Sequence, residues 1–233
     1  MGRNPMIKHT VTLAVLLCLF LETLFSEEAI AKVLSSNGVT KALNVEQILR
    51  VLSRGDDVFL GDMIVVGEAA KIQIKFTDGT LVNLIEKSQF WVKQYQYQKN
   101  QNANLFGAEL LKGGFRITTG DIEKTNPDKY QVKALNSTLG FMGTTLEAII
   151  DEDKLYARCV CGRAFLKNRL GEKIFGQGEA AQFVTTTVDS APEFLKNRPD
   201  EFSPTLFVPP MGSMNCSSGF DRFDPFIFEN QVK

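Results

Sequence analysis

Cysteines form the first group of residues that could do chemistry. Cys159 and Cys161 lie two apart on a predicted strand, so we expect both side chains on one face, and Cys216 lies near the C-terminus. A Cys-x-Cys pair could be a thiol redox site or bind a soft metal such as Cu(I). A bridge between Cys159 and Cys161 would be strained, because their Cα atoms would lie roughly 6.5 Å apart in an extended strand. We therefore favour a disulfide between Cys216 and one of them. No methionine or histidine cluster accompanies the pair, so we expect no metal.

Aspartates form the second group. Asp56, Asp57 and Asp62 could supply the two carboxylates that a glycosidase needs. They occupy Gly-Asp turns, however, where capping of the turn by the side chain is the usual role. The one histidine, His9, lies in a segment that we expect to be removed, which leaves no imidazole for a catalytic triad or a metal. We predict that the protein is not an enzyme and uses no cofactor.

The third group is the stretch Gly140-Phe-Met-Gly143-Thr144-Thr145, whose glycines could grip a phosphate or a nucleic-acid backbone. A P-loop needs a lysine after its last glycine and then a helix, and an RNA-binding KH domain needs helices on both sides. Here β-type residues follow Thr145 instead. We predict that Gly140 and Gly143 permit a bulge or a tight bend between two strands.

The first 31 residues have the pattern of a secretory signal. Arg3 and Lys8 precede an apolar run from Val11 to Leu21, and Ala29-Ile30-Ala31 has the small-x-small form of a cleavage site. Glu22 interrupts the run before the roughly 20 residues that a membrane span needs, although an uncleaved anchor is the alternative. We expect cleavage near Ala31, a periplasmic or extracellular location, and no transmembrane span afterwards.

Charge argues against nucleic acid as a partner. The chain has 26 basic and 27 acidic residues, and removal of the segment 1–31 takes away two basic and three acidic ones, which leaves 24 of each. A net charge of zero does not provide the broad basic surface that nucleic acids require.

Residues 32–188 show short alternating runs separated by glycine-rich turns, which predicts one all-β domain. Lys71–Phe76 alternates with period two, so Ile72, Ile74 and Phe76 should point inward and Lys71, Gln73 and Lys75 outward. Asp78-Gly79 marks a hairpin to a partner strand at Leu81–Ile85. Further strands are expected at 58–66, 90–97, 110–118, 130–134, 144–150, 155–160, 163–167 and 180–186, and a short helix at 45–52. The alternation fits short antiparallel strands in a β-solenoid as well as in a sandwich or roll.

Residues 189–233 form a separate, extended tail rich in proline and phenylalanine. Six of the eight prolines lie between Pro192 and Pro225, a density that blocks regular strand ladders. So much aromatic surface seeks cover, so we expect the tail either to wrap its own domain or to dock on a partner.

The segment "VKALNSTLGFMGTTL", residues 132–146, resembles the most recognisable part of the FecR domain. Gly140, Gly143 and Thr144 match the family's Gly-x-x-Gly-Thr motif, whereas Met142 replaces its usual arginine and Ala134-Leu135 its Thr-Pro. The hairpin with Asp78 and Gly79 also resembles a family motif. So does the Leu-x-x-Gly-x-x-Arg strand that contains Gly113 and Arg116.

The resemblance implies a stand-alone exported form of the FecR domain. Such proteins are not enzymes, so it implies a binding or signalling module of the bacterial cell envelope that contacts a protein or a cell-wall polymer. The regulators of iron uptake in this family add a sigma-factor-binding region and a membrane span, in whose place this sequence has the predicted signal. We therefore expect no sigma factor as a partner. The alternative is a redox or soft-metal protein that uses Cys159 and Cys161.

Overall fold

A computed structural model describes residues 28–99, 101, 103–177 and 183–202. The expectations for residues 1–27, including His9, and for Cys216 with the rest of 203–233 lie outside the described residues. The described part is all-β, as predicted, and about three-fifths of the chain is strand. It contains one short α-helix, α2 (Asp121–Thr125), and a 3-10 turn, η1 (Pro127–Lys129). No helix in this part is long and apolar enough to cross a membrane.

The strands follow one another with short turns. The first eight are β1 (Ala29–Asn37), β2 (Thr40–Leu43), β3 (Leu49–Val51), β4 (Asp57–Phe59), β5 (Met63–Val66), β6 (Lys71–Phe76), β7 (Leu81–Leu84) and β8 (Gln89–Gln96). The rest are β9 (Leu105–Thr118), β10 (Tyr130–Ala134), β11 (Ser137–Asp151), β12 (Lys154–Asn168), β13 (Gly171–Gly176), β14 (Phe183–Thr187) and β15 (Glu193–Leu195).

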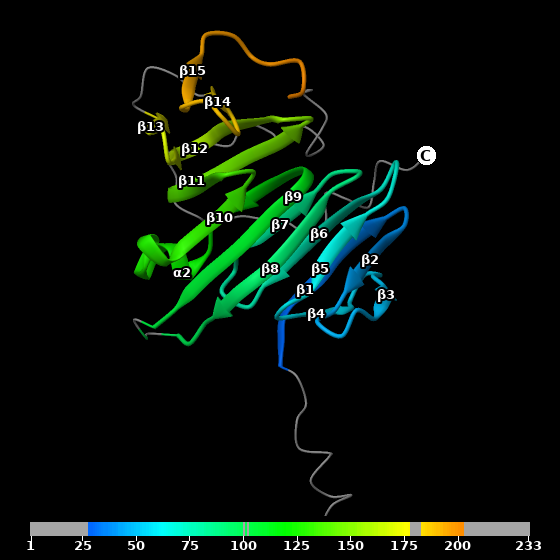
Figure 1. The fold of residues 1–233 in the computed structure, drawn as a ribbon. Helices are drawn as coiled ribbons and strands as arrows, with labels where there is room; N and C mark the ends of the chain where they lie inside the picture. Colours follow the sequence, from blue (N-terminus) through cyan, green and yellow to red (C-terminus); the bar gives the residue numbers. More distant parts are fainter. Residues whose placement is uncertain (1–27, 100, 102, 178–182, 203–233) are drawn as a thin grey trace, which may run out of the picture.

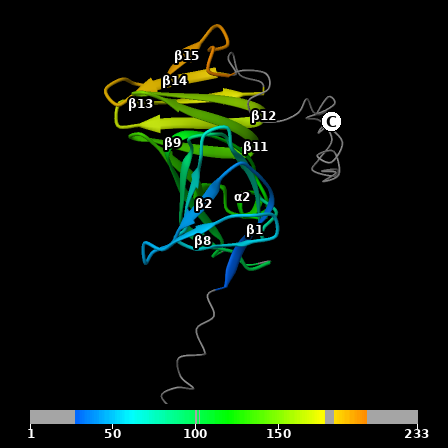
Figure 2. The same cartoon turned by 90° about the vertical axis from the view of Figure 1, so that its right-hand side faces the viewer.

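All strands belong to one open sheet that branches at the long strand β9. The first part of β9 pairs with β8 and, in parallel, with β10; its last part pairs with β7 and β11. One arm continues as β8-β5-β2-β3 and the other as β7-β6-β1-β4. The arms curl into a roll, and β11–β15 stack at the other end of the molecule (Figures 1 and 2). The roll is one of the architectures that the sequence left open; the parallel β9–β10 pair departs from the expected antiparallel order.

Aromatic rings from both arms fill the core. Phe76 of β6 meets Phe106 of β9 edge to face at 5.2 Å between ring centroids, and Phe106 stacks on Tyr130 at 4.5 Å. Tyr130 in turn meets Phe141 of β11 at 5.0 Å. Because each ring buries a large apolar area, this chain of contacts joins the roll to the stacked strands.

Several strand predictions are confirmed. β6 and β10 have the predicted ends, and β6 pairs with β7 through the Asp78-Gly79 turn. The runs 155–160 and 163–167, predicted as two strands, instead form the single strand β12, and a turn at 60–61 divides the predicted strand 58–66 into β4 and β5. Gln73, expected outside, is only 6% exposed, since it lies between Ser35 and Asn83 of the flanking strands.

The helix predicted at residues 45–52 is wrong. Asn44 Oδ1 accepts hydrogen bonds from the backbone N–H groups of Glu46 and Ile48, at 3.1 and 2.8 Å, and so closes a turn. Leu49–Val51 then pairs with β2 as strand β3.

The described start of the predicted tail is part of the sheet. β15 pairs with β14, and Phe202 is buried with its ring 5.7 Å from that of Phe183. The expectation that proline density prevents a strand ladder is wrong for Glu193–Leu195. Pro192 stands just before the strand, where its missing N–H costs no ladder hydrogen bond.

Candidate functional site

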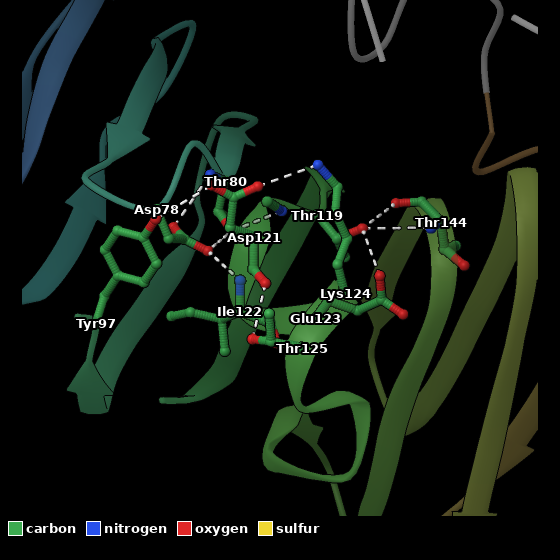
Figure 3. Close-up of polar contacts among 11 residues, drawn as sticks. Asp78, Thr80, Tyr97, Thr119, Asp121, Ile122, Glu123, Lys124, Thr125 and Thr144 are labelled. Carbon is green, nitrogen blue, oxygen red and sulfur yellow. Dashed lines mark hydrogen bonds and ion pairs between the residues drawn. The ribbon is translucent and has the colours of Figure 1, made fainter. Parts of the chain in front are cut away.

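Helix α2 brings together polar residues from three places in the sequence. It follows β9 directly and lies between the β6–β7 turn and a bulge in β11 (Figure 3). We call the buried residues Asp78, Thr80, Thr119, Glu123 and Thr144 the motif cluster, because it contains residues of two predicted family motifs.

Asp78 binds the start of α2 to the β6–β7 turn. Its Oδ1 accepts from Thr80 N at 3.1 Å and from Tyr95 OH at 3.3 Å. Its Oδ2 accepts from Thr80 Oγ1 at 2.8 Å and from Ile122 N at 3.4 Å, and its backbone carbonyl accepts from Asp121 N at 2.9 Å. The carboxylate thus satisfies donors from three segments, the kind of bonding that buried polar groups require.

Thr80 extends this bonding into the core. Its Oγ1 accepts from Gly120 N at 3.1 Å and from Tyr130 OH at 3.2 Å. Tyr130 is fully buried in the aromatic core, so the polar cluster and the apolar core share a residue. Tyr97 OH donates to Asp121 Oδ2 at 3.1 Å at the outer end of the cluster (Figure 3).

Glu123 binds α2 to β11. Its Oε1 accepts from Gly143 N at 2.8 Å, and its Oε2 lies 3.5 Å from Thr119 Oγ1. Thr119 and Thr144 are also joined, since Thr144 N donates to Thr119 Oγ1 at 3.3 Å and Thr119 N donates to Thr144 O at 3.2 Å. Thr144 Oγ1 donates to the carbonyl of Arg163 on β12.

Burial controls the protonation of both carboxyls. Desolvation raises the pKa of Asp78, opposed by the hydrogen bonds from Thr80, Ile122 and Tyr95. Desolvation likewise raises the pKa of Glu123, opposed by bonds from Gly143 and Thr119. A carboxyl whose oxygens all accept from its own chain has little capacity left for a substrate, so the geometry indicates a structural role.

The predicted bulge is confirmed at Gly143 but not at Gly140, which pairs in regular register with Phe165. The β11–β12 register shifts between Met142 and Thr145, and Gly143 has φ +64°, a conformation that glycine adopts without strain. Gly140 lies under the ring of Phe165, where an added Cβ would come within 1.9 Å of a ring carbon. The stretch therefore turns the strand and accommodates a ring, and its Gly143 N–H serves Glu123.

Gly113 and Arg116 lie on β9, away from the motif cluster. Ser88 fits against Gly113: its Oγ donates to Gly114 O at 2.9 Å and accepts from Gly114 N at 3.0 Å. Arg116 lies opposite Glu147 of β11, which lies opposite Arg158 of β12. We call Arg116, Glu147 and Arg158 the arginine row.

The two cysteines of β12 do not share one environment. A bulge at residue 160 places Leu146 opposite Cys159 and Thr145 opposite Cys161, so the predicted common face is wrong. Cys159 is a buried free thiol whose Sγ lies 3.2 Å from the carbonyl oxygens of Cys161 and Gly162. Burial raises its pKa to about 12, which suppresses the thiolate that redox and soft-metal chemistry need.

The aspartates of the Gly-Asp turns bind their own turns. Asp56 Oδ2 accepts from Ser53 N at 2.7 Å, and Asp62 Oδ2 accepts from Phe59 N at 2.8 Å. Asp57 pairs with Lys32 instead, on the neighbouring strand β1. Within the described ranges, no three His, Cys, Asp or Glu side chains are grouped to hold a metal.

Sequence reasoning missed Thr80, Thr119, Glu123 and helix α2 itself. A signal was present: Gly120 precedes acidic residues at Asp121 and Glu123, a combination typical of the first turn of a helix.

The fold and the cluster define an all-β domain whose motif residues fasten its own loops together. Residues 62–165 match the family model described as FecR protein. That range contains every member of the motif cluster.

Two solved structures are similar to the chain, both of a provisionally assigned anti-sigma factor from Parabacteroides distasonis ATCC 8503. The identities are 12% and 11% and the TM-scores 0.44 and 0.42. Each match covers 57% of this chain and 59% of the other, so the chain spans well under two thirds of those proteins. A comparison with curated protein sequences gave no match.

Proposed function

We propose that the chain is a non-catalytic, exported module of the bacterial cell envelope that binds a partner for assembly or signalling. One observation carries this proposal: the residues of the motif cluster, including Asp78, Glu123 and Thr144, fasten the loops of their own domain. Function must be argued from a site, and a module built in this way acts through its surface.

The outer end of one sheet arm supports binding of a protein. β3 pairs with β2 alone among the described strands, so its second edge is open to hydrogen bonding. Ile48, Leu49 and Val51 are more than half exposed there, as is Val45 in the preceding loop. An open edge with apolar side chains suits an added protein strand better than a cell-wall polysaccharide, which offers mainly hydroxyl groups.

The test is capture of envelope proteins by the full-length chain, followed by cross-linking. Leu49→Lys combined with Val51→Lys should abolish capture of a specific partner, because charges replace the apolar contacts at the edge. Leu170→Lys, at an exposed leucine between β12 and β13, is the matched control and should retain it. Equal capture by all three proteins would remove β3 as the binding edge, and no partner for any of them would count against the binding function.

Export is the second part of the proposal. Ala31 lies within β1, is 2% exposed and pairs with residues of β4 and β6. A cut after Ala31 would remove the first three residues of β1 but leave the β1–β6 pairs from Lys32 onward. N-terminal sequencing of protein recovered outside the cytoplasm should give a start close to Lys32; recovery in the cytoplasm with an intact N-terminus would contradict export.

We also propose that Cys216 pairs with Cys161. Cys159 is a buried free thiol, which leaves the half-buried Cys161 as the member of the pair suited to a bridge. Non-reducing peptide mapping should yield a Cys161–Cys216 peptide and an unmodified Cys159. A metal-loaded protein with Cys159 and Cys161 both reactive would instead establish the thiol alternative.

A further inference from the structure

The arginine row is a buried line of charge across the stacked strands. The Nε atom of Arg116 lies 3.5 Å from Glu147 Oε1, and an Nη atom of Arg158 lies 3.6 Å from Glu147 Oε2. The side chains are 12%, 7% and 30% exposed in the order Arg116, Glu147, Arg158. Two cations therefore share one carboxylate out of contact with most of the solvent.

Hydrogen bonding in the row is incomplete within the part of the chain that the structure describes. The Nε groups of Arg116 and Arg158 are buried and have no hydrogen-bond partner there. A buried guanidinium without full pairing is costly, and carboxylates are its best partners because they accept two parallel hydrogen bonds. The Nε atoms themselves are enclosed, so a further acceptor can reach the row only at its exposed end, where Arg158 is 30% exposed.

The described end of the chain leads onto this row. The Arg158 guanidinium lies 5.6 Å from the ring centroid of Phe183. The ring centroids of Phe183 and Phe202 are 5.7 Å apart. Burial raises the pKa of Glu147, and Arg198 opposes that rise together with Arg116 and Arg158, which places a third cation near the carboxylate. Three arginines thus lie near Glu147, while Glu201, which is hydrogen-bonded to Tyr156 of β12, brings a second carboxylate to this part of the sheet.

The segment 203–233 contains a suitable ligand for the row. Residues 220–229 read "FDRFDPFIFE", with Asp221, Asp224 and Glu229 against one arginine, Arg222, and phenylalanines between them. Its carboxylates match the guanidinium groups, and its rings can stack on the exposed part of the Arg158 guanidinium. The 17 residues between Phe202 and Phe220 can span up to about 60 Å when extended, so reach is no obstacle.

We propose that residues 220–229 dock on the exposed end of the arginine row of their own chain, where their carboxylates pair with Arg158 and with the nearby Arg198. Docking covers the face of β12 around Arg158, next to β14, β15 and Phe202. The arginine row is then an intramolecular binding site for the tail.

Limited chymotrypsin digestion of the full-length protein tests the proposal, because the enzyme cuts after the tail phenylalanines only when the segment is undocked. Arg158→Glu with Arg198→Glu should make cleavage within 220–229 roughly tenfold faster, since the rate follows the undocked population. Asp221→Arg with Asp224→Arg should do the same. The four changes combined restore opposite charges and should return the rate to within about twofold of the original.

Two controls fix the interpretation. Arg169→Glu changes an arginine that is 71% exposed in the β12–β13 turn and should leave the rate unchanged. Circular dichroism identifies a variant that fails to fold. In that case the single changes Arg198→Glu and Asp221→Arg, made separately and then together, repeat the charge exchange without altering a strand. Rapid tail cleavage in the original protein, or a charge exchange that does not restore protection, overturns the proposal. Protection that increases with protein concentration assigns the tail to a second copy and also overturns it.

Discussion

The motif cluster and the arginine row are both buried and charged, but they are satisfied to different degrees. In the cluster, each oxygen of Asp78 and Glu123 accepts at least one hydrogen bond, mostly from backbone N–H groups or short side chains. In the row, Glu147 meets its two arginines at 3.5 and 3.6 Å, and two arginine Nε groups have no partner among the described residues.

This difference distinguishes a cluster that holds the loops of the domain together from a row of charges that can bind another segment. Backbone donors are already fixed by the fold, so a carboxylate that they satisfy locks loops at little entropic cost. Long arginine side chains lose more freedom and keep unused donors, which suits a surface that another segment completes. A family motif can therefore mark the fastening, while the docking that we propose for the tail uses other residues of the same strands.

The largest effect is expected for Asp78→Ala. The change leaves Thr80 N, Ile122 N and Tyr95 OH without their acceptor in a buried place, so the free energy of unfolding should fall by about 3 kcal/mol. Urea denaturation followed by circular dichroism measures it.

Asp56→Ala is the matched control for that change. Asp56 is an exposed turn aspartate that accepts from Ser53 N, so its loss should cost less than about 1 kcal/mol. Equal losses in the two variants would mean that the motif cluster does not fasten α2, and the contrast with the row would disappear.

Much of the sheet could be predicted from local pattern. Period-two alternation and the Asp-Gly turn gave β6, β7 and their register, because one face of that hairpin packs on the core and the turn is local. The GxxG stretch was recognised as a bulge because its neighbours lack the helices that a ligand loop needs.

The errors came from contacts between distant segments and from side chains that override propensity. Asn44 closes a turn where a short helix was predicted, and Gln73 is covered by neighbouring strands that its own strand does not reveal. The motif cluster joins the turn after β6, the loop after β9 and the middle of β11. Sequence distance conceals such a meeting, so Glu123 could be assigned a partner only after the fold was known.

An intermediate effect is expected in the arginine row. Arg116→Met and Glu147→Met, made singly and together, form a double-mutant cycle. Because the pair is 3.5 Å apart without a hydrogen bond, its coupling energy should be about 1 kcal/mol or less, and Arg158 can still hydrate through its exposed part. Urea unfolding of the original protein, the two single variants and the double variant gives the coupling energy. A coupling energy above about 2 kcal/mol would mean that Arg116 and Glu147 are as fully bonded as the carboxylates of the motif cluster.

The smallest effect, with a defined pH dependence, is expected for Glu123→Gln. The amide keeps an acceptor for Gly143 N and can donate to Thr119 Oγ1, so stability at pH 7 should stay within about 0.5 kcal/mol of the original. Burial raises the pKa of Glu123 above its ordinary value of 4.5, so the folded state binds the proton more tightly than the unfolded state. The contribution of Glu123 to stability therefore falls as pH rises from about 4.5 through the folded pKa.

The glutamine side chain does not titrate, so the stability of Glu123→Gln relative to the original protein should increase across that pH window. Urea unfolding at half-unit steps from pH 4 to 7.5 measures the difference, and Glu123→Ala, which also removes the bonds to Gly143 and Thr119, should lose about 2 kcal/mol at pH 7. A loss of more than about 1 kcal/mol for the glutamine variant at pH 7 would mean that negative charge, and not hydrogen-bond geometry, holds the bulge. The motif cluster would then resemble the arginine row in depending on charge.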